Sequence, residues 1–187
     1  MKIRNTHLAI TGLVPSILGA LLLAGVSTLG DFIWTRFSVE HRPIYGLVHG
    51  TLLCSVLGSY LGLLRKRFLQ STLGGAAIGC GAAAGFYGLA RFAGMAAMFP
   101  LWMALWIGFA LLEAGTAGIK NSLLRGTLAA VASGLVFYAI SDIWLDREPG
   151  GPNYVRNFLS WTIAFLPGFL ALLAGRASSR DSRISAL

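Results

Sequence analysis

The sequence is poor in charged residues: Asp, Glu, Lys and Arg make up 12% of its 187 residues. A globular protein of this size carries about 25% charged residues, because its surface faces water. Hydrophobic residues make up 56% of the chain, and the mean hydropathy is +0.71. This balance excludes an ordinary water-soluble domain. It predicts a polytopic helical membrane protein, with residues 1–187 forming a single transmembrane domain.

Cysteine and acidic residues are also scarce, and each shortage excludes a kind of site. The two cysteines, Cys54 and Cys80, fall inside apolar runs. This placement argues against a structural disulfide and a zinc site, so we expect no metal and no cofactor. Asp and Glu together number seven, and we expect none of them in the interior of a membrane span. That leaves no carboxylate pair for acid–base catalysis.

Six stretches are long and apolar enough to cross a membrane. A hydrocarbon core of about 30 Å needs roughly 20 helical residues, and charged residues border such stretches here. The predicted spans are residues 8–30, 43–64, 69–90, 92–112, 123–141 and 158–175. The third and fourth spans have almost no loop between them, which predicts a tight helical hairpin. The predicted fold is therefore all-α, a polytopic transmembrane six-helix bundle.

Basic residues are distributed unequally between the two sides of this bundle. With six spans both termini lie on one side, and that side carries ten of the fifteen basic residues: Lys2, Arg4, Arg65, Lys66, Arg67, Lys120, Arg125, Arg176, Arg180 and Arg183. Because Lys and Arg near span ends favour the cytoplasm, both termini are predicted to be cytoplasmic. The same distribution explains the net charge of +8 without a nucleic-acid partner. The compact loops favour a bacterial inner membrane.

Glycine spacing predicts close helix packing in the third span. Gly75 and Gly79, and then Gly81 and Gly85, stand four residues apart. Such faces of small residues let helix backbones approach closely in a membrane. We therefore expect the third span to lie centrally in the bundle. The sequence leaves open whether the chain also forms a homo-oligomer.

The final third of the chain resembles a known family. Tyr154-Val155-Arg156, residues 164–168 (Ala-Phe-Leu-Pro-Gly) and Gly175-Arg176 resemble the end of the insulin-induced gene (Insig) membrane proteins. The fourth and fifth spans are also similar in pattern. The resemblance implies a compact six-helix bundle that binds a membrane lipid of the sterol or diacylglycerol class and has no catalytic activity.

The chain departs from that family near the surface where eukaryotic Insigs bind the protein Scap. In the family, an acidic residue followed by arginines comes after the fourth span. Here Glu113 stands closest to that position, and Ala114-Gly115-Thr116 follow it. The resemblance therefore implies a membrane lipid as partner, and the question of a protein partner stays open at this point.

Lipid binding assigns roles to particular residues. A hydrophobic ligand needs apolar walls and a few orienting polar groups. His49 is the one titratable group well inside a predicted span, and with Tyr45 it is a candidate orienting residue. The candidate wall residues are Phe86, Tyr87, Trp102, Trp106, Phe165 and Phe169, and the resemblance adds Tyr154 and Arg156 to the candidate ligand-binding residues.

Two other functions stay open at this point. One is a small channel or transporter for a neutral or hydrophobic solute, since the charges that couple transport to ions are scarce in the predicted spans. The other is a lipid-modifying enzyme that acts at the outer loops through Glu40, His41 and Asp146. The eight-residue separation of His41 from His49 fits no two-histidine metal site.

Overall fold

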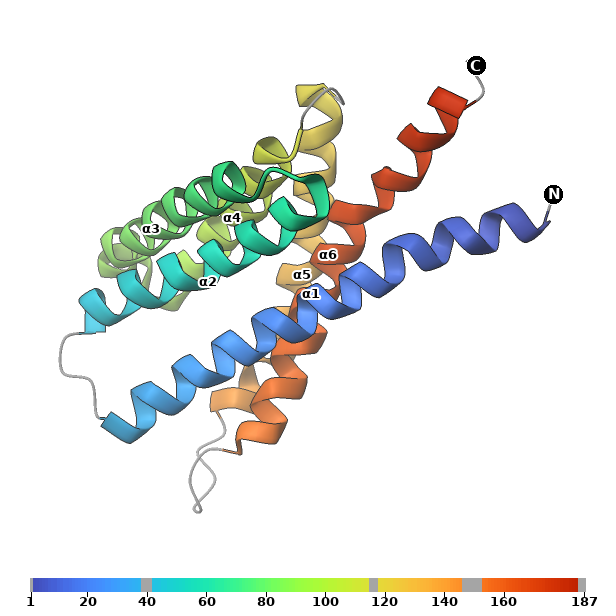
Figure 1. Cartoon of the computed structure of the whole chain (residues 1–187). Helices are drawn as coiled ribbons and strands as arrows, with labels where there is room; N and C mark the ends of the chain where they lie inside the picture. The colour runs from blue at the N-terminus through green and yellow to red at the C-terminus, as the bar shows by residue number, and fades with distance from the viewer. Residues whose placement is uncertain (1, 38–41, 115–117, 146–152, 185–187) are drawn as a thin grey trace.

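The computed structural model describes residues 2–37, 42–114, 118–145 and 153–184, with side chains described for residues 12–37, 43–94, 96–114, 118–140 and 153–173. These residues form helices and no strand (Figure 1). The elements are α1 (Lys2–Phe37), α2 (Arg42–Arg65), α3 (Phe68–Ala93), the short 3₁₀ helix η1 (Gly94–Ala97), α4 (Met98–Leu112), α5 (Ile119–Leu145) and α6 (Tyr154–Ile184). The prediction of an all-α fold with six main helices is confirmed for the described part of the chain.

Five helices are long and apolar enough to cross a membrane. The apolar segments are Gly12–Phe37, Pro43–Arg65, Phe68–Ala93, Ile119–Ile140 and Tyr154–Leu173. Their surfaces carry many exposed Leu, Ile, Val and Phe side chains. Such an apolar exterior is stable against lipid and unstable against water, so the helices support the predicted multi-pass membrane protein.

The predicted span at residues 92–112 is wrong in its boundaries. α3 continues to Ala93, so Phe92, which is 91% exposed, belongs to the last turn of α3. Helix η1 follows, and α4 begins at Met98 and has 15 residues. At 1.5 Å per residue, α4 is about 22 Å long, which is less than the hydrocarbon core of about 30 Å. The tight hairpin is confirmed, because η1 alone joins α3 to α4.

The first helix is longer than predicted and contains a carboxylate. The predicted span ended at Gly30, before Asp31, whereas α1 continues to Phe37. No Gly or Pro stands between Asp31 and Pro43, so no helix-breaking residue follows Asp31 directly. The expectation that span interiors contain no acidic residue is therefore wrong at Asp31.

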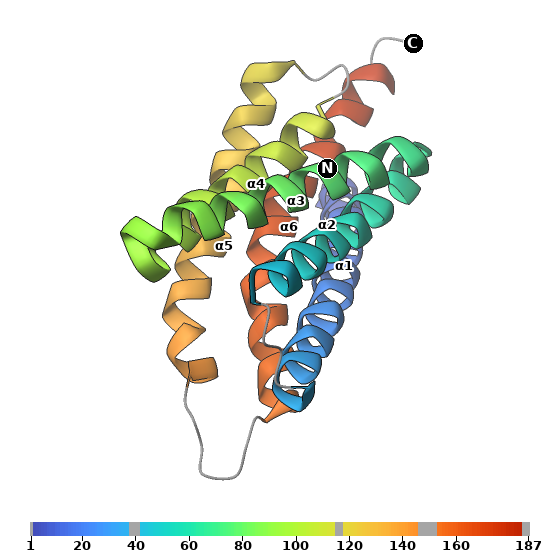
Figure 2. The same cartoon turned by 90° about the vertical axis from the view of Figure 1, so that its left-hand side faces the viewer.

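The helices pack mainly against particular neighbours. α1 and α6 lie side by side, and α5 packs on α6 (Figures 1 and 2). α2 and α3 form an antiparallel pair, and α4 contacts both α3 and α5. The beginning of α1 and the end of α6 lie at the same end of the molecule (Figure 1).

Glycines on both partners bring α2 and α3 together. A Cβ atom added to Gly75 would overlap the carbonyl oxygen of Cys54, and one added to Gly79 would overlap that of Gly50. On the other helix, a Cβ atom on Gly58 would overlap the Ser71 carbonyl oxygen. The backbones are therefore in direct contact, which confirms the packing role predicted for Gly75 and Gly79.

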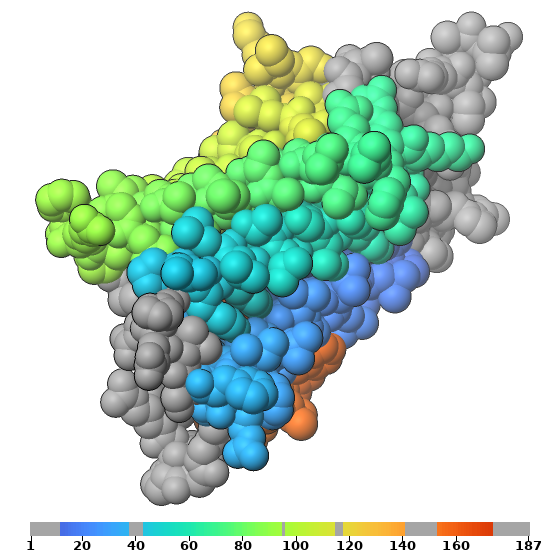
Figure 3. Space-filling model, turned by 60° about the vertical axis from the view of Figure 1, so that its left-hand side comes forward, coloured from blue at the N-terminus to red at the C-terminus, as the bar shows by residue number. Residues whose placement is uncertain are grey.

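α3 is not central in the bundle, contrary to the prediction. Only 11% of the residues in its most apolar stretch are buried, against 33% for α1, α5 and α6. Figure 3 shows α3 as a ridge on the outside of α2. Of the second glycine pair, Gly81 has nothing within 4 Å of an added Cβ atom, and Gly85 faces Leu101 of α4. The prediction failed because small residues on two faces of α3 do not show that both faces have partners.

Candidate functional site

Four of the predicted wall residues lie together in the core. Trp102 and Trp106 belong to α4, Phe165 and Phe169 to α6, and all four are buried. The Trp102 and Phe165 rings stack with centroids 5.6 Å apart, and the Trp106 and Phe169 rings meet edge to face at 5.8 Å. The Trp106 indole also packs directly on the backbone of Gly168. The rings fill the space between these helices, and their contact with a ligand stays a prediction.

A buried hydrogen-bond chain stiffens this aromatic core. Trp102 Nε1 donates to Ser133 Oγ at 3.1 Å, and that hydroxyl donates to the carbonyl oxygen of Ala164 at 2.7 Å. Bonds of this kind hold helices together where no water competes. They join α4, α5 and α6 into one unit.

The other predicted residues lie away from this core. The Tyr87 hydroxyl packs on Gly46 of α2, and the Phe86 and Tyr87 rings meet at 5.2 Å. The Tyr154 ring lies edge to face with Phe32 at 5.5 Å. The backbone N–H of Arg156 donates to Asn153 Oδ1 at 3.1 Å, which caps the start of α6. The structure thus divides the predicted site residues between the core and the end of the bundle near residues 30–49.

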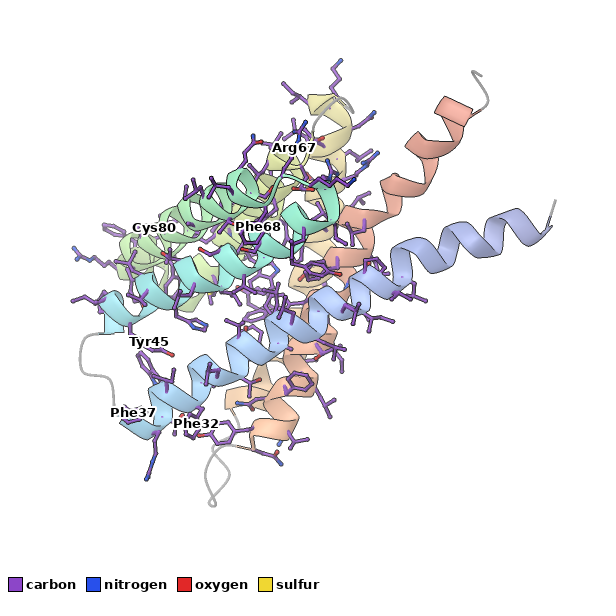
Figure 4. The ribbon with its side chains drawn as sticks, in the orientation of Figure 1. Phe32, Phe37, Tyr45, Arg67, Phe68 and Cys80 are labelled. Atoms are coloured by element: carbon purple, nitrogen blue, oxygen red, sulfur yellow. The ribbon has the colours of Figure 1, made fainter. Side chains whose placement is uncertain are left out.

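Tyr45 and His49 lie together against α1. Their rings stack 5.8 Å apart with an interplanar angle of 3°. The Tyr45 hydroxyl donates to the carbonyl oxygen of Gly30 at 2.5 Å, and the His49 ring packs directly on the Gly30 backbone. Figure 4 shows Tyr45 lying between α2 and α1. Among the described residues the structure shows no hydrogen bond to either imidazole nitrogen of His49.

Asp31 belongs to the same region and was missed by sequence reasoning. Trp161 Nε1 donates to Asp31 Oδ2 at 2.9 Å, and Asn157 Nδ2 donates to the same oxygen at 3.4 Å. Both donors come from α6 and are neutral. Two features of the sequence could have identified Asp31. No helix-breaking residue follows it directly, and Asn157 and Trp161 stand four residues apart, which places both on one helix face.

Two hydroxyls just before Asp31 lack partners in the described structure. Several Ser and Thr hydroxyls in these helices donate to the carbonyl four residues earlier, as Ser16 and Thr35 do. Ser27 Oγ and Thr28 Oγ1 are buried and make no hydrogen bond within the described residues. Ser27 is 1% exposed, and it lies four residues before Asp31, hence on the same helix face.

Between α1 and α2, aromatic side chains make the main contacts. Tyr60 donates to the Pro15 carbonyl oxygen at 2.5 Å, and its ring packs on Gly19. Tyr45 and His49 make the equivalent contacts with Gly30 nearer the other end. We call this contact the α1–α2 seam, formed by Tyr45, His49 and Tyr60 of α2 with Gly19 and Gly30 of α1.

An ion pair between half-buried Arg65 and the buried Glu113 carboxylate holds the opposite end of α2. Arg65 Nε lies 2.5 Å from Glu113 Oε2, and the guanidinium also donates to the Glu113 carbonyl oxygen. Ser71 Oγ lies 3.5 Å from Glu113 Oε1. Glu113, the position singled out by the family resemblance, therefore joins α4 to α2 and α3 in this chain.

The residues of the predicted enzyme site, Glu40, His41 and Asp146, lie outside the described residues. Within the described residues, no group of three His, Cys, Asp or Glu side chains could hold a metal ion. Comparison with protein-family models, with curated proteins and with solved structures found no match.

Proposed function

We propose that this chain is a non-catalytic integral membrane protein that binds one membrane lipid at the Gly30 end of the α1–α2 seam, where Tyr45 and His49 lie. In this proposal all six helices cross the membrane, α4 together with η1 forms the short fourth crossing, and both termini are cytoplasmic. The observation that carries the proposal is His49, a polar ring within a span whose nitrogens have no hydrogen-bond partner among the described side chains. A lipid head offers such a partner.

The construction of the seam supports access from the bilayer. Its contacts depend on rings that can change rotamer, whereas backbone contacts between glycines cannot separate without moving whole helices. Apolar side chains beside the seam are exposed, including Leu29 of α1 and Val48 and Leu52 of α2. A lipid with its head at Tyr45 and His49 places its chains against these side chains. The ligand class, sterol or diacylglycerol, follows from the resemblance to Insig.

Native mass spectrometry of the full chain in mild detergent tests the proposal. We expect one sterol or diacylglycerol molecule to remain bound per chain at defined stoichiometry. His49→Phe keeps a ring against Gly30 and Tyr45 but removes both nitrogens, so binding is expected to weaken by about tenfold, the loss of one hydrogen bond.

Ser55→Ala is the matched control for His49→Phe. Ser55 lies on the same helix, and its hydroxyl donates only to the Thr51 carbonyl oxygen, so binding is expected to stay unchanged. A mixture of loosely held lipids with no mass shift on adding sterol or diacylglycerol would contradict the proposal.

A further inference from the structure

We infer that Asp31 binds the positively charged amine of a ligand head, which makes an amine-bearing phospholipid of the phosphatidylethanolamine class the ligand of the seam. This inference rests on the proposed lipid binding at the seam and replaces sterol or diacylglycerol with an amine-bearing phospholipid as the ligand class. Its basis has two parts. Asp31 is an acidic residue inside a span, and two neutral donors bond one oxygen of its carboxylate. Aromatic rings and a buried hydroxyl lie in the same region.

The charge of Asp31 is the first step. Within the described structure its carboxyl group makes no ion pair with Lys, Arg or His, and its donors are the indole of Trp161 and the amide of Asn157. Both donors bond Oδ2, so the bonds orient the carboxylate and leave Oδ1 for another partner. A charge inside a membrane span is costly without a counter-charge. A ligand ammonium group supplies that counter-charge.

The surroundings of Asp31 are the second step. Trp34 lies one turn further along α1, and its ring is 5.2 Å from the Tyr45 ring. Aromatic faces attract ammonium groups, and a carboxylate beside such rings is the usual composition of a site for organic cations. The buried hydroxyl of Ser27, unpartnered among the described residues, lies on the same helix face as Asp31. It offers the head a further hydrogen bond.

A lipid is the source of the ammonium group that the structure favours. Asp31 is half-buried within an apolar span, and the exposed side chains of Leu29 and Val48 next to the seam are apolar. Apolar side chains of this kind face the acyl chains of the bilayer, so a lipid reaches Asp31 from within the membrane, whereas a soluble amine must first leave water. An amine-bearing phospholipid therefore satisfies both the charged and the apolar parts of the site.

The test is a competition on the purified full chain between phosphatidylethanolamine and diacylglycerol with the same acyl chains, read by native mass spectrometry. Phosphatidylethanolamine is expected to be preferred by about tenfold. Asp31→Asn, which keeps an oxygen that can accept from Trp161, is expected to abolish the preference, and Asp31→Glu to retain it. Thr35→Val is the matched control, because this exposed residue lies one turn away and bonds only the Asp31 carbonyl oxygen.

The possible outcomes distinguish the failure of this inference from the failure of the proposed function. Equal binding of the two lipids by the wild-type chain and by Asp31→Asn overturns the inference but leaves lipid binding intact. No bound lipid of either kind overturns both. Displacement of the lipid by soluble ethanolamine in an Asp31-dependent way upholds ammonium recognition and overturns the lipid as its source. A thermal melt of Asp31→Asn that matches the wild-type chain shows that a lost preference does not come from misfolding.

Discussion

Helix α2 contacts its two chain neighbours in opposite ways. Against α3, glycines allow backbone-to-backbone contact, as Gly75 lies on the carbonyl oxygen of Cys54. Against α1, Tyr45, His49 and Tyr60 extend from α2 and end on the backbone of the other helix. The α2–α3 interface is made largely of backbone atoms, which have no rotamers, and the α1–α2 seam is made of rings that have several.

The difference teaches where this protein is rigid and where it can admit a ligand. In a membrane, burial of apolar surface gives no drive for helices to associate, so packing and hydrogen bonds hold them together. The α2–α3 interface depends on packing over its length, while the α1–α2 seam depends on a few hydrogen bonds and ring contacts. We therefore expect substitutions at α2–α3 to affect stability most and substitutions at the seam to affect ligand binding most.

The largest effect is expected at the glycine interface. Gly75→Leu places a side chain where even a Cβ atom would overlap backbone, so α2 and α3 must separate. We expect a loss of about 3 kcal/mol or more in the free energy of unfolding, measured by thermal or denaturant unfolding in detergent. Gly81→Leu on the same helix is the control, because nothing lies within 4 Å of its added Cβ atom. Equal losses in the two variants would show that α3 packs elsewhere.

A smaller effect is expected at the ion pair that holds the end of the same interface. Arg65→Met removes the guanidinium that pairs with the Glu113 carboxylate, which is 5% exposed. Stranding a buried charge costs about 2 kcal/mol or more, which the same unfolding measurements would detect. Arg67→Met, at an exposed neighbouring position, is expected to change stability little. An unchanged unfolding curve for Arg65→Met would mean that the pair does not connect α4 to α2.

The smallest effects on stability are expected at the α1–α2 seam, and they sharpen its comparison with the α2–α3 interface. Tyr45→Phe and Tyr60→Phe each remove one hydrogen bond to α1, and each should cost about 0.5–1.5 kcal/mol. Tyr45→Phe is expected to weaken lipid binding as well, since Tyr45 stacks on His49, whereas Tyr60→Phe is expected to leave binding unchanged. Lipid titration of both variants checks this, and equal binding losses would argue against a head site at Tyr45.

Several features of the fold could be predicted from composition and spacing. The apolar runs predict membrane helices, and the helices at 43–64 and 69–90 agree with α2 and α3 to within a few residues. The four-residue spacing of Gly75 and Gly79 predicts close packing, which they make with α2. These predictions succeed because membrane thickness and helical periodicity depend on local sequence alone.

Other features of the fold could not be predicted from the sequence, because they depend on which helices pack against each other. Gly81 has the same spacing to Gly85 as Gly75 has to Gly79, yet it has no neighbour. Asp31 has the appearance of a loop residue, yet it lies inside α1, where Trp161 and Asn157, more than 120 residues later, donate to it. A spacing rule can identify a surface suitable for contact, but it cannot say whether a partner covers that surface.

The sequence by itself determined that this protein is a set of apolar helices, most of them of membrane-spanning length, because 12% charged residues cannot cover a water-facing surface of this size. It also determined that α3 carries faces for close approach, since glycine spacing follows helical geometry. The tertiary structure alone decided that α2 binds α3 through backbone and α1 through rings, and that Asp31 meets α6. These contacts join residues far apart in the chain, and their choice depends on the packing of all the helices at once.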